Sequence, residues 1–372
     1  MKIFVVNLLL FFVNLSNACT PTLTTVSGSK APPAGFCSGD LIFEENFDNL
    51  DQSKWRHEIT MAGGGNFEFQ WYVNDRFNSY TLGGNLHLKP TFTSDIFGEE
   101  FLTSGRVVIP PYECTEWYNN GCDRQGTPDN IINPIRSARI DTQNSFSFKF
   151  GTLEFRAKMP AGDWLWPALW MMPKESVYGG WPRSGEIDVM EMRGNRALFA
   201  DYGQGGHVGN EQASCTIHFG PSVTVKNHWP KAHFAKNQNV GWNENFHLYR
   251  VTWSPTQIRF LIDWDLVGTI EPSEGFWKYG NFESSGLSNP WSGGTNMAPF
   301  DQEFFIIINL AVGGTNFFDD SFVNRDYPKP WLNSSPRAAA DFWEGRSKWE
   351  PTWNRYNDDS HLQVDYVRVW AM

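Results

Sequence analysis

Short runs in which apolar and polar residues alternate recur along the chain. The alternation is clearest in GTLEFRAKM at 151–159, where every second residue is apolar, and it recurs in LQVDYVRVW at 362–370. A period of two predicts strands with one face buried and one face wet. Gly, Asn, Asp and Pro clusters separate these runs, and no long helical pattern interrupts them. Similar short runs occur at 41–43, 67–72, 86–88, 139–140, 186–192, 247–253, 258–262 and 304–312.

This pattern predicts an all-β protein, an antiparallel β-sandwich, because many short strands occur without strand–helix–strand alternation. One short helix is expected near residue 336, with Ser335 as its N-cap and Pro336 at its first position.

The N-terminal segment predicts export. Met1 and Lys2 precede an apolar run to Val13, and small residues follow at 16–18. The run is shorter than the ~20 residues of a membrane-spanning helix, so residues 1–18 are expected to be a cleavable signal peptide. Residues 19–36 are expected to form an irregular leader, and residues 37–372 a single domain. No later stretch is apolar enough to suggest a membrane segment.

Composition narrows the possible partners. The formal net charge of −11 argues against nucleic acid, whose binding needs a basic face, and against an anionic membrane. Aromatic residues make up 16% of the chain, with 18 Trp, which is more than a β core alone requires. Trp stacks well on the apolar faces of sugar rings.

Five cysteines in an exported chain permit disulfides. Cys114 and Cys122 bracket a short polar loop, and Cys19 and Cys37 would close the leader. Cys215 lies in an apparent strand and is interpreted as a buried free thiol, with a reactive thiol as the alternative.

The strongest chemical signal is the stretch WPRSGEIDVMEMR at 181–193, with Glu186, Asp188 and Glu191 inside six residues. The first two point to one face of a strand, but the odd spacing would turn Glu191 into the core. Because an unpaired buried carboxylate is costly, we predict a β-bulge near Val189 and Met190 that returns Glu191 to the same face.

Three neighbouring carboxylates repel one another, so at least one should keep its proton near neutral pH. Glycosidases use such a split between a charged and a protonated acid. A metal site or an acidic edge strand is the alternative. A calcium loop would contain Asp, Asn and Gly turns, and an edge strand would not carry Ile and Val between its acids.

The stretch resembles the active-site signature of glycoside hydrolase family 16, in its laminarinase branch, which has one extra residue between the Asp and the second Glu. The resemblance extends over nearly the whole chain from Cys37. The supporting strings are CSGDLIF at 37–43, GNFEFQWY at 65–72, WPALWMMP at 166–173, TIHFG at 216–220, NLAVGG at 309–314 and LQVDYVRVW at 362–370.

The resemblance implies a β-jelly-roll with a sugar-binding groove across its concave sheet. It implies that Glu186 is the nucleophile, that Glu191 is the acid/base and that Asp188 assists Glu186. No cofactor is expected, since this hydrolysis needs only carboxylates and water. Many family members bind a structural calcium, and Asp365 matches one ligand, but Asn46 stands where an acid would be expected.

The sequence identifies the residues that would line a sugar-binding groove less clearly than it identifies the acids. Trp166, Trp170 and Trp181 flank the acids in sequence, and each could instead belong to the core. His218 could bond sugar hydroxyls or the catalytic acids, or could have a purely structural partner. The remaining candidates for sugar binding are Asn74, Arg76 and Asn309.

The resemblance therefore implies a secreted, monomeric endo-β-1,3-glucanase of the retaining type, acting on laminarin-like β-glucan. Two alternatives use the same fold. A β-glucan recognition protein would bind without turnover, although such relatives typically lack one or both glutamates and carry an additional N-terminal domain. A transglycosylase would use the same residues with a sugar as acceptor.

Overall fold

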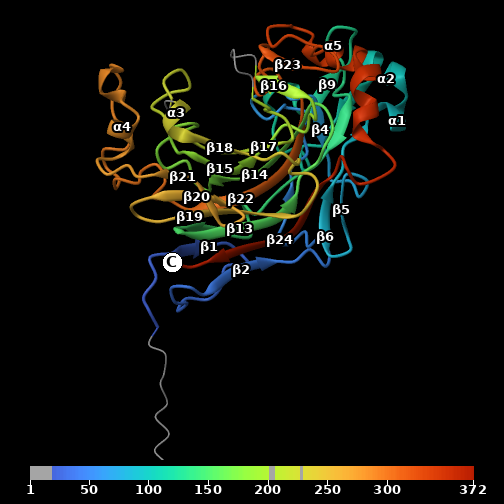
Figure 1. The fold of residues 1–372 in the computed structure, drawn as a ribbon. Helices are drawn as coiled ribbons and strands as arrows, with labels where there is room; N and C mark the ends of the chain where they lie inside the picture. The colour runs from blue at the N-terminus through green and yellow to red at the C-terminus, as the bar shows by residue number, and fades with distance from the viewer. Residues whose placement is uncertain (1–18, 201–205, 227–228) are drawn as a thin grey trace, which may run out of the picture.

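The computed structural model describes residues 19–200, 206–226 and 229–372. The predicted signal peptide at 1–18 lies outside these ranges. Two antiparallel sheets form the body of the protein, one above the other (Figure 1). The predicted β-sandwich is therefore confirmed. Within the described residues, no helix is both long and apolar enough to cross a membrane.

The larger sheet has nine strands and contains the acidic stretch. Its central order is β22, β14, β15, β17. Its members are β1 (Thr25–Ser27), β12 (Ser147–Lys149), β22 (Phe304–Val312), β14 (Leu165–Pro173), β15 (Glu186–Glu191), β17 (Gln212–His218), β18 (His233–Asn237), β11 (Arg139–Asp141) and β3 (Arg56–His57).

The second sheet has eight strands and includes the C-terminal one. They are β21 (Asp265–Ile270), β20 (Ile258–Ile262), β19 (His247–Trp253), β13 (Gly151–Lys158), β24 (Leu362–Trp370), β6 (Asn85–Leu88), β5 (Ser79–Leu82) and β2 (Leu41–Glu45).

Smaller elements surround the two sheets. Three small sheets comprise β4 (Gln70–Tyr72), β10 (Ile135–Ser137) and β7 (Thr91–Phe92); β16 (Leu198–Ala200) and β23 (Phe322–Asn324); and β8 (Arg106–Val108) and β9 (Asp123–Gln125). The helices are α1 (Ser94–Phe97), α2 (Glu99–Ser104), α3 (Trp229–Ala232), α4 (Phe276–Tyr279), α5 (Ala338–Glu344) and α6 (Arg346–Trp349), with 3-10 turns η1 (Tyr118–Asn120), η2 (Phe282–Ser284) and η3 (Glu350–Trp353). Most of these short helices carry no pattern long enough to predict from sequence.

The sheets enclose a core built from alternate residues of their strands. Leu169 of β14 pairs with Ile308 of β22, and both are fully buried. From the opposite sheet, Leu153 of β13 and Val251 of β19 join the same buried cluster. The other residues of the nine-stranded sheet face away from this core. Loops with α3 and α4, and loops with β16, β23 and α5, rise beyond that outer face (Figure 1).

The structure corrects three details of the sequence prediction. The leader is not wholly irregular, because Thr25–Ser27 forms β1 and pairs with β12. The run 67–72 is a strand only from Gln70, since Phe67 has a positive φ of 52°. The short helix begins at Ala338, two residues later than expected, and the Ser335 hydroxyl accepts a hydrogen bond from the backbone N–H of Arg337 in the preceding turn.

The cysteine prediction is confirmed. Disulfides join Cys19 to Cys37 and Cys114 to Cys122, and among the described residues Cys215 is free and buried. The second bridge lies at the base of the β8–β9 hairpin, where the backbone N–H of Ile109 donates to the carbonyl of Cys122.

We predict that the double variant Cys114→Ala/Cys122→Ala lowers the free energy of unfolding by about 2–3 kcal/mol, because the bridge closes a loop only eight residues long. Urea denaturation, with wild type beside the variant, measures the difference. A change below about 0.5 kcal/mol would mean that the bridge does not restrict the unfolded chain as this reasoning requires.

Candidate active site

The predicted bulge is present in β15. Against β17, Asp188 pairs with Thr216 and Glu191 pairs with Ser214, so three steps on β15 match two on its neighbour. Against β14, the register also shifts, and Glu191 lies opposite Ala168. The extra residue restores Glu191 to the outer face that Glu186 and Asp188 occupy. All three acids therefore face away from the core.

Each glutamate is held by an indole. Trp166 donates from Nε1 to Glu191 Oε1 at 2.9 Å, and Trp181 donates from Nε1 to Glu186 Oε2. Trp166 is only 9% exposed and stacks on Phe317 with ring centroids 4.0 Å apart. Trp181 is 39% exposed. Trp166 thus orients an acid, while Trp181 also presents an open ring.

Asp188 lies between the two glutamates, and its pKa is also perturbed. Burial raises its pKa well above the ordinary value, and the charges of Glu186 and Glu191 add to this effect. His218 Nε2 lies 3.1 Å from Asp188 Oδ2 and opposes the shift. Otherwise Asp188 Oδ2 has no hydrogen-bond partner in the part of the chain that the structure describes.

His218 supplies the compensating charge. Burial disfavours its cation, but the three carboxylates outweigh burial and raise the pKa of His218 to about 10. The Asp188 side chain is buried and the His218 side chain is partly exposed, so the pair lies at the edge of solvent beside both glutamates. His218 is therefore a partner of the acids.

Glu191 also has a raised pKa. Burial raises its pKa, with a further contribution from Glu186, whereas His218 and the Trp166 hydrogen bond lower it. The net shift is upward, so Glu191 keeps its proton to higher pH than an exposed glutamic acid.

A second polar chain extends the site across the sheet. Trp170 donates to Asn309 Oδ1 at 2.6 Å, and Asn309 donates to the Tyr72 hydroxyl at 3.1 Å. The Arg139 guanidinium lies 4.6 Å from the Trp170 ring centroid and forms an ion pair with Glu58 at 2.9 Å. These residues form a connected network on the same outer face as the acids.

Sequence reasoning identified Trp170 and Asn309 but missed Tyr72, Arg139 and Glu58. Arg139 had a usable signal, because a charged residue inside a short strand run must reach a partner. The identity of that partner depends on the pairing of β11 with β22 and β3, which local sequence does not reveal.

Asn74 and Arg76 lie several strands away from the acids, and their expected role on the non-reducing-end side of a sugar groove stays a prediction. The Arg76 guanidinium contacts the Asn74 side chain and lies 3.3 Å from His57 Nε2. His57 belongs to β3, which β11, β22 and β14 separate from β15. The structure therefore places this pair toward the far side of the sheet, away from the acids.

Asp365 does not present a free carboxylate for calcium, because it forms an ion pair with Arg156. Asn46 accepts a hydrogen bond from Arg368 at 3.3 Å. Asp365 and Asn46, the two positions compared with the calcium site, therefore both contact arginine side chains. The prediction that no cofactor is needed stays a prediction.

The fold and the row of acids define a β-sandwich of the glycoside hydrolase type. The model of the family "Glycosyl hydrolases family 16" matches residues 130–301. A beta-1,3-glucan-binding protein of Penaeus monodon is 46% identical over 343 residues, 89% of this chain and 90% of that protein. The chain belongs to glycosyl hydrolase family 16.

More distant similarities agree with this assignment. A beta-1,3-glucan-binding protein of Tenebrio molitor is 31% identical over 96% of this chain and 70% of its own length. The solved laminarinase of Rhodothermus marinus superimposes with a TM-score of 0.56 at 23% identity, covering 90% of this chain and 98% of that one. The latter likeness concerns the fold alone.

We predict that Trp166→Phe raises the pKa of Glu191, because the variant removes the N–H that stabilises its carboxylate. Titrating ¹³C-labelled glutamate side chains by NMR measures this directly. Trp170→Phe is the matched control, since that indole donates to Asn309 and should leave Glu191 unchanged. A lowered pKa in Trp166→Phe would contradict the assigned role.

Proposed function

We propose that this protein is a secreted endo-β-1,3-glucanase that hydrolyses laminarin-type glucan with retention of configuration. The observation that carries the proposal is the bulge in β15, which places Glu186 and Glu191 on one face. Two carboxyl groups on one face, one of them with a raised pKa, suit a double-displacement glycosidase.

The proposed reaction begins with Glu186 attacking the anomeric carbon while Glu191 protonates the departing glycosidic oxygen. The indole of Trp181 fixes the Glu186 carboxylate through its hydrogen bond. The products of this step are a glycosyl–Glu186 ester and a shortened glucan chain. Orienting the nucleophile in advance lowers the entropic part of the barrier.

Formation of the ester then prepares the second step. The charge of Glu186 contributes to the raised pKa of Glu191, and esterification removes that charge. The pKa of Glu191 should therefore fall once the intermediate forms. Deprotonated Glu191 can then take a proton from water, whose oxygen attacks the anomeric carbon and releases Glu186.

The substrate assignment rests on the relatives and on the aromatic surface beside the acids. The two animal proteins described above are named for binding beta-1,3-glucan. Trp181 has an exposed ring next to Glu186, which suits stacking on a glucose face. Secretion is supported by the two disulfides, which form and persist in oxidising compartments.

A second candidate is a glucan-binding protein without turnover. It is favoured by the names of those same relatives, the first of which shares 46% identity with this chain. A pure binder, however, has no need for a Glu191 whose pKa is raised and whose carboxyl group is oriented by an indole. Incubating the wild-type protein with laminarin separates the two: tight binding without new reducing ends would establish the binder.

We predict that Glu186→Gln lowers kcat on laminarin by more than about 10³-fold, because the amide keeps the shape of the side chain but cannot act as the nucleophile. Laminarin affinity should stay within about threefold of wild type, since stacking does not need the charge. Reducing-end assays and calorimetry measure the two quantities.

Glu44→Gln is the control for this experiment. Glu44 lies on β2 of the other sheet and pairs with Arg368, so its loss should leave kcat essentially unchanged. Turnover of Glu186→Gln within tenfold of wild type would place the nucleophile on another residue.

A further inference from the structure

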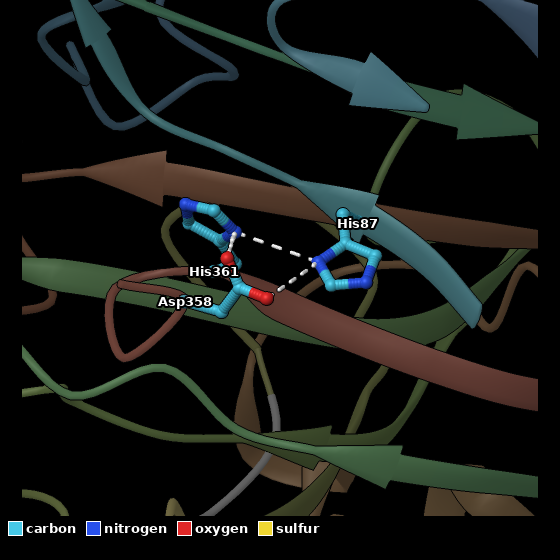
Figure 2. Close-up of side chains that lie close together, drawn as sticks. All are labelled: His87, Asp358 and His361. Atoms are coloured by element: carbon cyan, nitrogen blue, oxygen red, sulfur yellow. Dashed lines mark hydrogen bonds and ion pairs between the residues drawn. The ribbon is translucent and has the colours of Figure 1, made fainter. Parts of the chain in front are cut away.

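Three side chains far from the acids converge at one end of the eight-stranded sheet. His87 lies on β6, His361 directly precedes β24, and Asp358 lies in the loop before it (Figure 2). The two Nδ1 atoms are 3.4 Å apart. Asp358 places Oδ1 3.2 Å from His361 Nδ1 and Oδ2 3.9 Å from His87 Nδ1. All three donor groups therefore point at one small volume.

The separation of the two imidazole nitrogens matches an edge of a coordination tetrahedron, whereas Asp358 Oδ2, at 3.9 Å from His87 Nδ1, lies farther away. With zinc–nitrogen bonds of about 2.0–2.1 Å, two ligand atoms on a tetrahedron lie about 3.3–3.4 Å apart. The two Nδ1 atoms already have this spacing, and the 3.2 Å between Asp358 Oδ1 and His361 Nδ1 is close to it. As a hydrogen bond between two imidazoles, 3.4 Å is long, since the normal range ends near 3.2 Å. The geometry suits a shared cation better than direct bonding.

The surroundings hold the rings in place. His87 and His361 are 3% and 2% exposed, and the ring of Tyr80 stacks on that of His87 at 5.1 Å. His87 also hydrogen bonds to the backbone of Leu82, the kind of outer contact that orients metal-binding imidazoles. Asp358 is about half exposed, so an ion can enter from solvent.

We propose that His87, Asp358 and His361 bind a divalent transition-metal cation, with zinc as the best fit and water at the fourth position. Two imidazoles and one carboxylate are typical zinc ligands, whereas calcium takes six to eight oxygens. The bound ion would join β6 to the segment before β24, which are neighbours in the sheet. It would serve to stabilise this sheet and would not act on glucan.

The experiment must separate this site from the acids of β15, because Glu186, Asp188 and His218 are also close enough together to hold a metal. Chelator-treated full-length protein is titrated with zinc chloride by calorimetry, and thermal unfolding is recorded with and without zinc. The variants are His361→Gln, Asp358→Asn and, for the other cluster, Asp188→Asn. His247→Gln is the matched control, because His247 on β19 of the same sheet pairs with Asp263, and among the described residues no third metal-ligating side chain joins them.

We expect His361→Gln to weaken zinc binding by more than about 100-fold, since even the loss of an outer-shell partner costs about 10- to 100-fold. Asp358→Asn is expected to weaken zinc binding at least tenfold, and it should not disturb folding because the Asp358 side chain is about half exposed. Zinc should raise the melting temperature of wild type, Asp188→Asn and His247→Gln, but not that of His361→Gln.

Two results would overturn the proposal. One is wild-type protein that binds no zinc below about 100 μM. The other is zinc binding that Asp188→Asn abolishes while Asp358→Asn and His361→Gln retain it. Circular dichroism of each variant confirms that loss of binding is not loss of folding.

Discussion

The single extra residue in β15 is the constraint on which the site depends. In an unbroken strand, Glu191 would point between the sheets, among side chains such as Leu169 and Ile308, where a lone carboxyl group is strongly destabilising. The bulge turns Glu191 outward while Ile187 and Met190 still fill the core. Packing of the sandwich and assembly of the acids are therefore satisfied by the same local irregularity.

Placing three carboxyl groups side by side creates repulsion that the neighbouring strands must offset. β17 supplies His218 as a cation beside Asp188, and β14 supplies the Trp166 N–H to Glu191. Because β15 lies between these two strands, the His218 cation and the Trp166 N–H both come from strands adjacent to it in the sheet. Asp188 and Glu191 nevertheless keep raised pKa values, and for Glu191 this direction agrees with the acid/base role proposed for it.

Much of this could be predicted from sequence, because alternation, spacing and the cost of burying charge are local rules. These rules predicted the β-sandwich, the β-bulge in the acidic strand and both disulfides. The contacts of Arg139 with Trp170 and Glu58 could not be predicted in this way, since they join strands that are distant in the chain. The proximity of His87 and His361 could not be predicted for the same reason. They are 274 positions apart in the chain, and the pairing of β6 with β24 brings them together.

The measurement that tests the central claim most directly is the anomeric form of the first product. If the bulge allows Glu186 and Glu191 to act on the same glycosidic bond, two successive inversions at the anomeric carbon release a β-configured reducing end. Proton NMR during the first minutes of laminarin hydrolysis, before mutarotation equilibrates the anomers, should show the β signal growing first. An initial α signal would mean a single inversion by water, and the assigned roles of the two glutamates would be wrong.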